Sequence, residues 1–151
     1  MRVVVVAGPP GAGKTTFVEK NRRSGDVILD RDRLWSAFSC EPLHIKPPGL
    51  FPLVESAFRA VLGKLGDART QEDLRTVWIV TGAARCDQRQ EYRDRFDAEV
   101  LVFEIPASSC LKHIAEGEGR CGSTESWAPI IHKWWKQYEP DPKDKIVRET
   151  D

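Results

Sequence analysis

The most informative segment of the chain is Arg2-Val3-Val4-Val5-Val6-Ala7-Gly8-Pro9-Pro10-Gly11-Ala12-Gly13-Lys14-Thr15-Thr16. Its first part is a short apolar run of β-branched residues, which is typical of a strand buried on both faces of a parallel sheet. Its second part, from Gly8 to Thr15, matches the phosphate-binding pattern Gly-x-x-x-x-Gly-Lys-Thr at every fixed position. Because this pattern follows a predicted strand and precedes a helical segment, it predicts a P-loop rather than an unrelated turn.

A P-loop holds the phosphates of a nucleoside triphosphate with many closely spaced donors. Glycines let backbone N–H groups point inward, and the N-terminus of the next helix adds the positive end of its dipole. We expect the catalytic Lys14 to reach the β- and γ-phosphates and the Thr15 hydroxyl to bind Mg²⁺. The predicted nucleotide-binding residues are Gly8, Pro9, Pro10, Gly11, Ala12, Gly13, Lys14, Thr15 and Thr16.

Length and charge narrow the class of protein. The chain has 151 residues, with 23 Lys or Arg balancing 23 Asp or Glu. This length suits one domain, which we place at residues 1–151. The zero net charge argues against binding nucleic acid through a general basic excess. Since no apolar segment reaches membrane-spanning length, we expect a cytoplasmic protein without membrane contact.

Apolar runs alternate with segments of helical periodicity along the rest of the chain. Strands are predicted at 26–29, 74–81, 98–105 and 145–148. Helices are predicted at 15–20, 34–38, 52–65, 87–95, 110–116 and 127–138, with an irregular proline-rich loop at 40–50 and a polar connection at 66–73. Ser108 or Ser109 is expected to cap the helix at 110–116. This order predicts an α/β fold with three layers around a mostly parallel sheet of four or five strands.

Charged residues follow the second predicted strand in the run Asp30-Arg31-Asp32-Arg33. Such a position, just beyond the carboxyl end of a strand, is where open α/β sheets bind ligands. An alcohol that attacks a γ-phosphoryl group needs a proton acceptor within hydrogen-bond reach, and a carboxylate near the P-loop fits this role. Asp32 is the first candidate and Asp30 its substitute; alternatively, either residue caps the following helix.

A glycine-rich segment late in the chain, at about 117–123, contains Arg120. A loop of this kind can close over a nucleotide, exclude water and bring an arginine onto the transferring phosphoryl group. An arginine in that role is worth about 10³–10⁵ in rate. We therefore predict a mobile lid with Arg120 as a catalytic and phosphate-binding residue, the alternative being a solvated surface arginine.

These motifs resemble, in the same order, those of the kinase domain of phage-type polynucleotide 5′-kinases. That domain belongs to the adenylate-kinase-like group of P-loop kinases, and the resemblance extends over most of the chain to a final helix ending in Tyr138. It implies that ATP is the phosphoryl donor. It also implies that Asp32 activates the acceptor hydroxyl and that Arg120 holds the phosphates.

Two departures from this family lie on the acceptor side. The arginine that holds the acceptor's phosphate in the family is missing, because the Asp30–Arg33 run leads into Trp35. The family's Asp-Thr-Asn after the third strand is replaced by Gly82-Ala83-Ala84, which leaves Mg²⁺ mainly to Thr15 and the nucleotide. The alternative phosphate contacts, or else solvated surface charges, are Arg31, Arg33, Arg85 and Arg89.

The residues and the resemblance together predict an ATP-dependent phosphotransferase that moves the γ-phosphate to a hydroxyl. The expected partners are the nucleotide donor and, as acceptor, a polynucleotide 5′-hydroxyl or a related nucleotide. One alternative is a kinase for a small molecule, such as a nucleoside monophosphate, a sugar or an antibiotic. The other is a P-loop ATPase module that acts through partners. No feature of the sequence indicates an oligomeric state.

Overall fold

The computed structural model describes residues 1–117 and 124–149. Within this part of the chain, one sheet of five parallel strands has the order β2-β3-β1-β4-β5. The strands are β1 (Arg2–Ala7), β2 (Val27–Asp30), β3 (Thr76–Thr81), β4 (Glu99–Phe103) and β5 (Lys145–Val147). The predicted α/β fold around a parallel sheet of four or five strands is confirmed.

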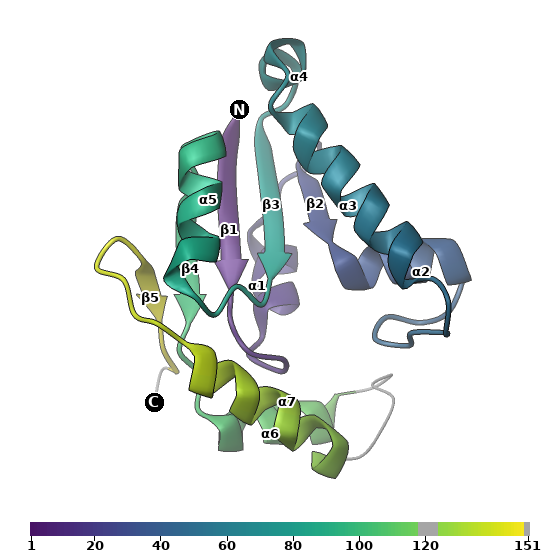
Figure 1. Cartoon of the computed structure of the whole chain (residues 1–151), viewed down its shortest axis with the longest axis vertical. Helices are drawn as coiled ribbons and strands as arrows, with labels where there is room; N and C mark the ends of the chain where they lie inside the picture. Colours follow the sequence, from purple (N-terminus) through teal and green to yellow (C-terminus); the bar gives the residue numbers. More distant parts are fainter. Residues whose placement is uncertain (118–123, 150–151) are drawn as a thin grey trace.

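Helices cover both faces of this sheet. They are α1 (Lys14–Asn21), α2 (Arg31–Ser39), α3 (Phe51–Leu65), α4 (Ala68–Asp73), α5 (Cys86–Phe96), α6 (Ala107–Glu116) and α7 (Thr124–Gln137). In Figure 1, α3 and α5 lie in front of the sheet and α1 lies behind it, which gives the three predicted layers. Helices α6 and α7 pack against each other beyond the carboxyl ends of the strands (Figure 1).

The valine run forms β1, the central strand, and its burial explains its composition. From Val3 to Ala7, each residue is at most 2% exposed. Successive side chains of a strand point to opposite faces of the sheet. Val3 and Val5 therefore pack in the same cluster as Phe58 of α3, whereas Val4 and Val6 pack in the cluster on the other face.

Two local predictions are wrong. The connection at 66–73 contains α4, a helix of six residues whose N-cap Asp67 accepts a hydrogen bond from the backbone N–H of Arg69 (3.2 Å). This helix has no apolar periodicity to reveal it and begins at a capping carboxylate instead. Helix α6 begins after Pro106, so Ser108 and Ser109 lie inside its first turn and not at the cap.

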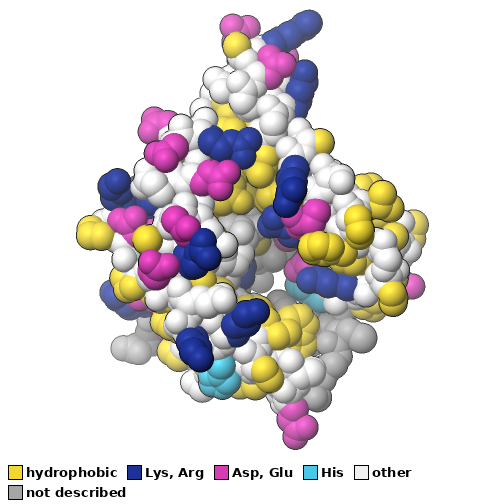
Figure 2. All heavy atoms as spheres, in the orientation of Figure 1, with side chains coloured by type: hydrophobic (Ala, Val, Ile, Leu, Met, Phe, Trp, Pro, Cys, Tyr) yellow, Lys and Arg dark blue, Asp and Glu magenta, His cyan; other side chains and the backbone are white. Residues whose placement is uncertain are grey.

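The parallel arrangement of the strands brings three segments discussed in the sequence analysis to one edge of the sheet. All the strands end at the lower edge in the view of Figure 1. The P-loop follows β1, the Asp30–Arg33 run begins at the last residue of β2, and Gly82-Ala83-Ala84 follows β3. On the face shown in Figure 2, a hollow lies between the α3 side and the α5 side, with side chains of both charges around it.

Candidate functional site

The P-loop is shaped by glycines, each for an identifiable reason. Gly11 has a φ of +78° and Gly13 a φ of +90°, values that other residues adopt only with strain. The loop is also packed closely. A Cβ atom on Gly11 would lie 2.6 Å from the carbonyl oxygen of Cys110 in α6, and one on Gly8 would lie 2.9 Å from the Cβ of Phe103. Glycine at these positions therefore lets the loop seat against β4 and α6.

A cleft of about 840 Å³ opens beside this loop. All of the predicted nucleotide-binding residues from Gly8 to Thr16 except Pro9 line it. The Nζ atom of Lys14 lies 2.7 Å from the carbonyl oxygen of Gly8 and 2.8 Å from that of Pro9, which holds the ammonium group at the loop. The structure thus brings the predicted phosphate-binding groups together in one cleft.

Helix α6 adds a contact to this cleft. The Nδ1 atom of His113 lies 2.8 Å from the carbonyl oxygen of Gly11, and the side chain lines the cleft together with Gly117. This contact ties α6 to the P-loop. Residues 118–123, and with them Arg120, lie outside the described residues, so the lid and its arginine remain predictions.

Asp30 and Asp32 occupy different environments although only one residue separates them. Asp30 ends β2 and caps α2, where its Oδ1 atom accepts a hydrogen bond from the backbone N–H of Asp32 (3.0 Å). Burial, together with the nearby charge of Asp32, raises the pKa of Asp30, which is 5% exposed. The capping alternative therefore holds for Asp30.

Asp32 faces the cleft from the first turn of α2. Its Oδ2 atom lies 3.1 Å from Nδ1 of His44, and its Oδ1 atom lies 3.3 Å from Nζ of Lys46. Burial alone would raise the pKa of Asp32, but the hydrogen bond from His44 and the charge of Lys46 outweigh it and lower the pKa to about 2. Both partners come from the loop at 40–50 and also line the cleft. Their sole signal in the sequence is a His and a Lys, two residues apart, between Pro42 and Pro47.

Two of the arginines considered as phosphate contacts already have carboxylate partners at the surface. A nitrogen of Arg33 lies 2.8 Å from Glu19, and a nitrogen of Arg85 lies 2.6 Å from Asp87. Since surface pairs of this kind are weak, either arginine remains able to change partner.

Arg89 is neither a phosphate contact nor a solvated charge, although the charged sequence of α5 is typical of an exposed helix. Its side chain is 0% exposed, and its Nε atom lies 3.0 Å from Oδ2 of Asp144. Its Nη1 atom donates to the carbonyl oxygens of Ala83 (2.9 Å) and Ala84 (2.7 Å), and its Nη2 atom donates to that of Glu139. The guanidinium thus joins the segment after β3 to the C-terminal part of the chain.

A second hydrogen bond holds the same segment. The indole N–H of Trp134 in α7 donates to the carbonyl oxygen of Gly82. Trp134 is 6% exposed and stacks on Tyr138 with ring centroids 4.8 Å apart. The backbone that replaces the family's acidic segment is therefore fixed by residues far along the chain.

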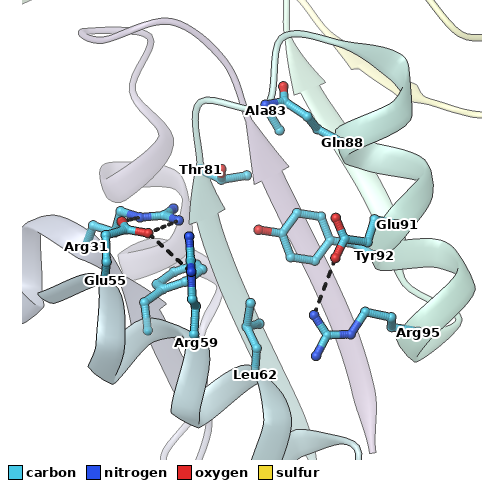
Figure 3. Close-up of a pocket in the computed structure, with 11 residues that line it drawn as sticks. Arg31, Glu55, Arg59, Leu62, Thr81, Ala83, Gln88, Glu91, Tyr92 and Arg95 are labelled. Carbon is cyan, nitrogen blue, oxygen red and sulfur yellow. Dashed lines mark hydrogen bonds and ion pairs between the residues drawn. The ribbon is translucent and has the colours of Figure 1, made fainter. Parts of the chain in front are cut away.

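A second cavity, of about 590 Å³, lies between α3 and α5. Figure 3 shows side chains from both helices around it, above the sheet. Its lining consists of Arg31, Glu55, Phe58, Arg59, Leu62, Thr81, Ala83, Gln88, Glu91, Tyr92 and Arg95. Arg31 and Thr81 line both this cavity and the P-loop cleft, so the two spaces adjoin.

Charges of both signs face this second cavity. Arg31 pairs with Glu55 and lies over the ring of Phe58, 3.8 Å from its centroid. The hydrogen bond from Arg31 lowers the pKa of Glu55, so this carboxylate is ionised at neutral pH. Arg59 lies 4.0 Å from the other oxygen of Glu55 and is largely exposed. A cavity lined in this way can hold a polar molecule that has both an anionic group and hydroxyls.

These features define a P-loop protein with a kinase-like fold. A family profile described as an AAA domain matches residues 3–127, and the chain belongs to this family. No curated protein matches the chain. None of the helices in the described part of the chain has the length and apolar character needed to cross a lipid bilayer.

Solved structures of kinases have the same fold. A shikimate kinase from Bacteroides thetaiotaomicron matches with a TM-score of 0.62 and 14% identity, over 97% of this chain and 86% of that one. A gluconokinase from Sinorhizobium meliloti 1021 matches with a TM-score of 0.58 and 13% identity, over 97% and 82%. A chain of the Pnkp1/Rnl/Hen1 RNA repair complex matches with a TM-score of 0.59 and 16% identity, over 91% of this chain but 46% of that one. Because the sequence identities are this low, the similarity to these structures shows that the fold is shared and nothing more specific.

Proposed function

We propose that the protein is an ATP-dependent phosphotransferase that moves the γ-phosphoryl group to a hydroxyl of an acceptor bound between α3 and α5. The observation that carries the proposal is the pair of adjoining spaces, which share Arg31 and Thr81 at the carboxyl edge of the sheet. Hydrolysis of ATP needs room only for water, whereas a cavity of this size accommodates a second substrate.

The donor side fits a nucleoside triphosphate and a magnesium ion. Backbone N–H groups of the P-loop and the ammonium of Lys14 suit the β- and γ-phosphates. Mg²⁺ prefers oxygen ligands, and the cleft offers the Thr15 hydroxyl and the carboxylate of Asp30. A bound Mg²⁺ ion would neutralise charge on the transferring phosphoryl group.

The lining of the second cavity favours a small polar acceptor. Its volume lies within the roughly 300–1,000 Å³ that small-molecule sites occupy. Arg59 and Arg95 are suited to an anionic group of the acceptor, and Glu55 and Glu91 to its hydroxyls. Two of the similar structures are named as small-molecule kinases, for shikimate and gluconate, which supports this acceptor class.

A polynucleotide 5′-hydroxyl is the second candidate acceptor. The sequence resemblance to polynucleotide kinases and the match to a chain of an RNA repair complex support it. Exposed cations also line the two spaces, since the side chains of Arg59 and Lys46 are 80% and 49% exposed. In this case the terminal nucleotide would enter the cavity and the next phosphates would meet these cations.

The test is incubation with γ-labelled ATP, Mg²⁺ and a panel of acceptors: nucleosides, nucleoside monophosphates, sugars, sugar acids, and 5′-hydroxyl DNA and RNA oligonucleotides. We expect label in a phosphomonoester of one acceptor class, and about 10²–10³ times less of it in the same time with the Lys14→Met variant. Label in a small molecule would support the first acceptor class, and label in an oligonucleotide the second. Label in inorganic phosphate alone, whatever the acceptor, would contradict phosphotransfer and favour an ATPase module.

A further inference from the structure

His44 lies in an unusual position for a loop residue. It belongs to the segment at 40–50 between α2 and α3, and it lines the P-loop cleft together with Lys14, Thr15 and Asp32. Its side chain is 16% exposed. Its backbone φ is +73°, in the left-handed region that residues other than glycine seldom adopt. Strain of this kind persists where the surroundings fix a residue, and it is frequent at functional sites.

Asp32 is poorly suited to take a proton, although it is the first candidate from the sequence. Both of its carboxylate oxygens already have a donor, His44 on one and Lys46 on the other. A hydroxyl that is to give its proton to Asp32 would have to displace one of these two donors. General bases work best when their proton affinity matches the working pH, and an imidazole is the side chain that meets this condition most readily.

The contact with Asp32 also fixes the tautomer of His44. An ionised carboxylate only accepts hydrogen bonds, so Nδ1 of the ring must carry the proton that points at Asp32. In the neutral ring, Nε2 then has its lone pair free. Among the described residues, none makes a hydrogen bond to Nε2 of His44. The same logic operates wherever a carboxylate orients an imidazole and stabilises the imidazolium that forms.

We propose that Nε2 of His44 takes the proton of the acceptor hydroxyl, and that Asp32 is the positioning residue that orients the ring. The inference rests on the proposed phosphotransferase function. The acceptor oxygen forms a bond to the γ-phosphorus while the bond from that phosphorus to the β,γ-bridging oxygen breaks. The hydroxyl proton moves to Nε2, and ADP leaves with the electron pair of the broken bond. The proton passes to solvent when the imidazolium is next deprotonated.

The charged groups around this ring have identified partners. The Asp32 carboxylate contacts Nδ1 of His44 directly, whereas the ammonium of Lys46, on the same loop, contacts the other oxygen of that carboxylate. Arg31 lines the same cleft, but its guanidinium pairs with Glu55. The direct hydrogen bond from Nδ1 to Asp32 therefore arranges the pair of His44 and Asp32 to accept a proton during transfer.

Two substitutions of His44 distinguish a role as proton acceptor from a purely structural contact with Asp32. His44→Ala removes the ring and leaves space for free imidazole. His44→Asn tolerates a positive φ and retains an amide that can donate to Asp32, but it has no basic nitrogen. The exposed His132 of α7 supplies the matched control, His132→Ala. Circular dichroism and thermal unfolding establish that each variant is folded.

The experiment measures kcat and the KM for ATP with γ-labelled ATP and the acceptor that the wild-type protein labels in the panel above. We expect both His44 variants to lose about 10²–10⁴ in kcat, with the KM for ATP within about twofold of the wild type and the control unchanged. Added imidazole should restore turnover to His44→Ala and not to Asp32→Asn, and the rescue should grow with the unprotonated fraction of imidazole.

Full activity of His44→Asn would overturn the assignment. The assignment would also be overturned if imidazole failed to rescue His44→Ala and Asp32→Asn lowered kcat more than either His44 variant. Either result would return the role of base to Asp32. Those results leave the phosphotransferase function intact, because the wild type still transfers label. Failure of the wild type to label any acceptor would overturn both.

Discussion

The donor side and the acceptor side of this site are built in different ways. The donor side comes from one continuous segment, Gly8 to Thr16, whose glycines seat it against its neighbours. The acceptor side is assembled from α2, α3, α5 and the end of β3, and its lining extends from Arg31 to Arg95. Phosphate is recognised mainly by the backbone of a local turn, whereas an acceptor is recognised by side chains that only the fold brings together.

The two sides also differ in what fixes them. The P-loop is held by close packing on α6, at Gly11, and by the contact with His113. The segment after β3, beside the acceptor cavity, is held by a buried arginine that reaches the C-terminal part of the chain. The acceptor side therefore depends on a long-range ion pair, and substitutions there test the comparison most strongly.

The largest expected effect is on stability, in Arg89→Met. This change removes one of the two arginines that pair with the buried carboxylate of Asp144, the other being Arg93, and it removes donors from three carbonyl groups. Breaking a buried pair in this way costs about 3–5 kcal/mol in the free energy of unfolding. Urea denaturation measures it, with the exposed Arg85→Met as control, for which we expect less than about 1 kcal/mol. Equal losses in the two variants would show that Arg89 does not fix the acceptor side.

The next effect is on the donor side, in Lys14→Met. The ammonium at the loop is lost, so we expect turnover to fall by about 10²–10³ and ATP affinity to weaken, with no loss of folding. Label transfer and titration with a fluorescent ATP analogue measure the two quantities. Lys64→Met is the control, because Lys64 of α3 is largely exposed and pairs with Asp67, the N-cap of α4. Unchanged ATP affinity in Lys14→Met would break the assignment of the donor side.

A smaller effect concerns acid stability through Asp32. Its pKa in the folded protein, about 2, lies below the ordinary value of 3.8, so its stabilising contribution is complete above about pH 4 and is lost as the pH falls towards 2. The shift corresponds to roughly 2 kcal/mol. We expect Asp32→Asn to unfold with less denaturant than the wild type at about pH 5, and the difference to disappear by about pH 2. A difference that persists at the lower pH would contradict the contacts with His44 and Lys46.

The smallest effect is expected from Arg59→Ala. Because this guanidinium is largely exposed, we expect its removal to raise the KM for an anionic acceptor by tenfold or less, which is at most about 1.4 kcal/mol. The KM for ATP should not change, and this split between the two substrates sharpens the comparison. Arg69→Ala, on the exposed helix α4, is the control in the same initial-rate assay. Equal changes in both KM values would place Arg59 outside the acceptor side.

The sequence could predict the donor side because its signal is local. A valine run buried on both faces and a P-loop of nine residues follow one another, and the alternation of strands and helices then requires a parallel sheet. The contacts of Asp32 with His44 and Lys46 were not predictable in this way. A histidine in a proline-rich loop has no periodicity, and its distance to α2 depends on how the loop folds back.

Arg89 shows the same limit more sharply. Its neighbours in α5 are charged, so a local pattern predicts an exposed helix, and its partner Asp144 is 55 residues away. The short helix α4 escaped prediction for a different reason, since a capping carboxylate at Asp67 determines its start and no apolar face accompanies it. Long-range charge pairs and caps, unlike buried strands, leave no repeating pattern in a sequence.

The central claim is that donor and acceptor occupy adjoining spaces at the same time, and the initial-rate pattern tests it most directly. Phosphorylation is measured while ATP and the labelled acceptor are varied together. Simultaneous occupancy of the P-loop cleft and the α3–α5 cavity predicts intersecting lines in a double-reciprocal plot, with ADP formed only as acceptor is consumed. Parallel lines, or ADP formation at the same rate without acceptor, would contradict the account.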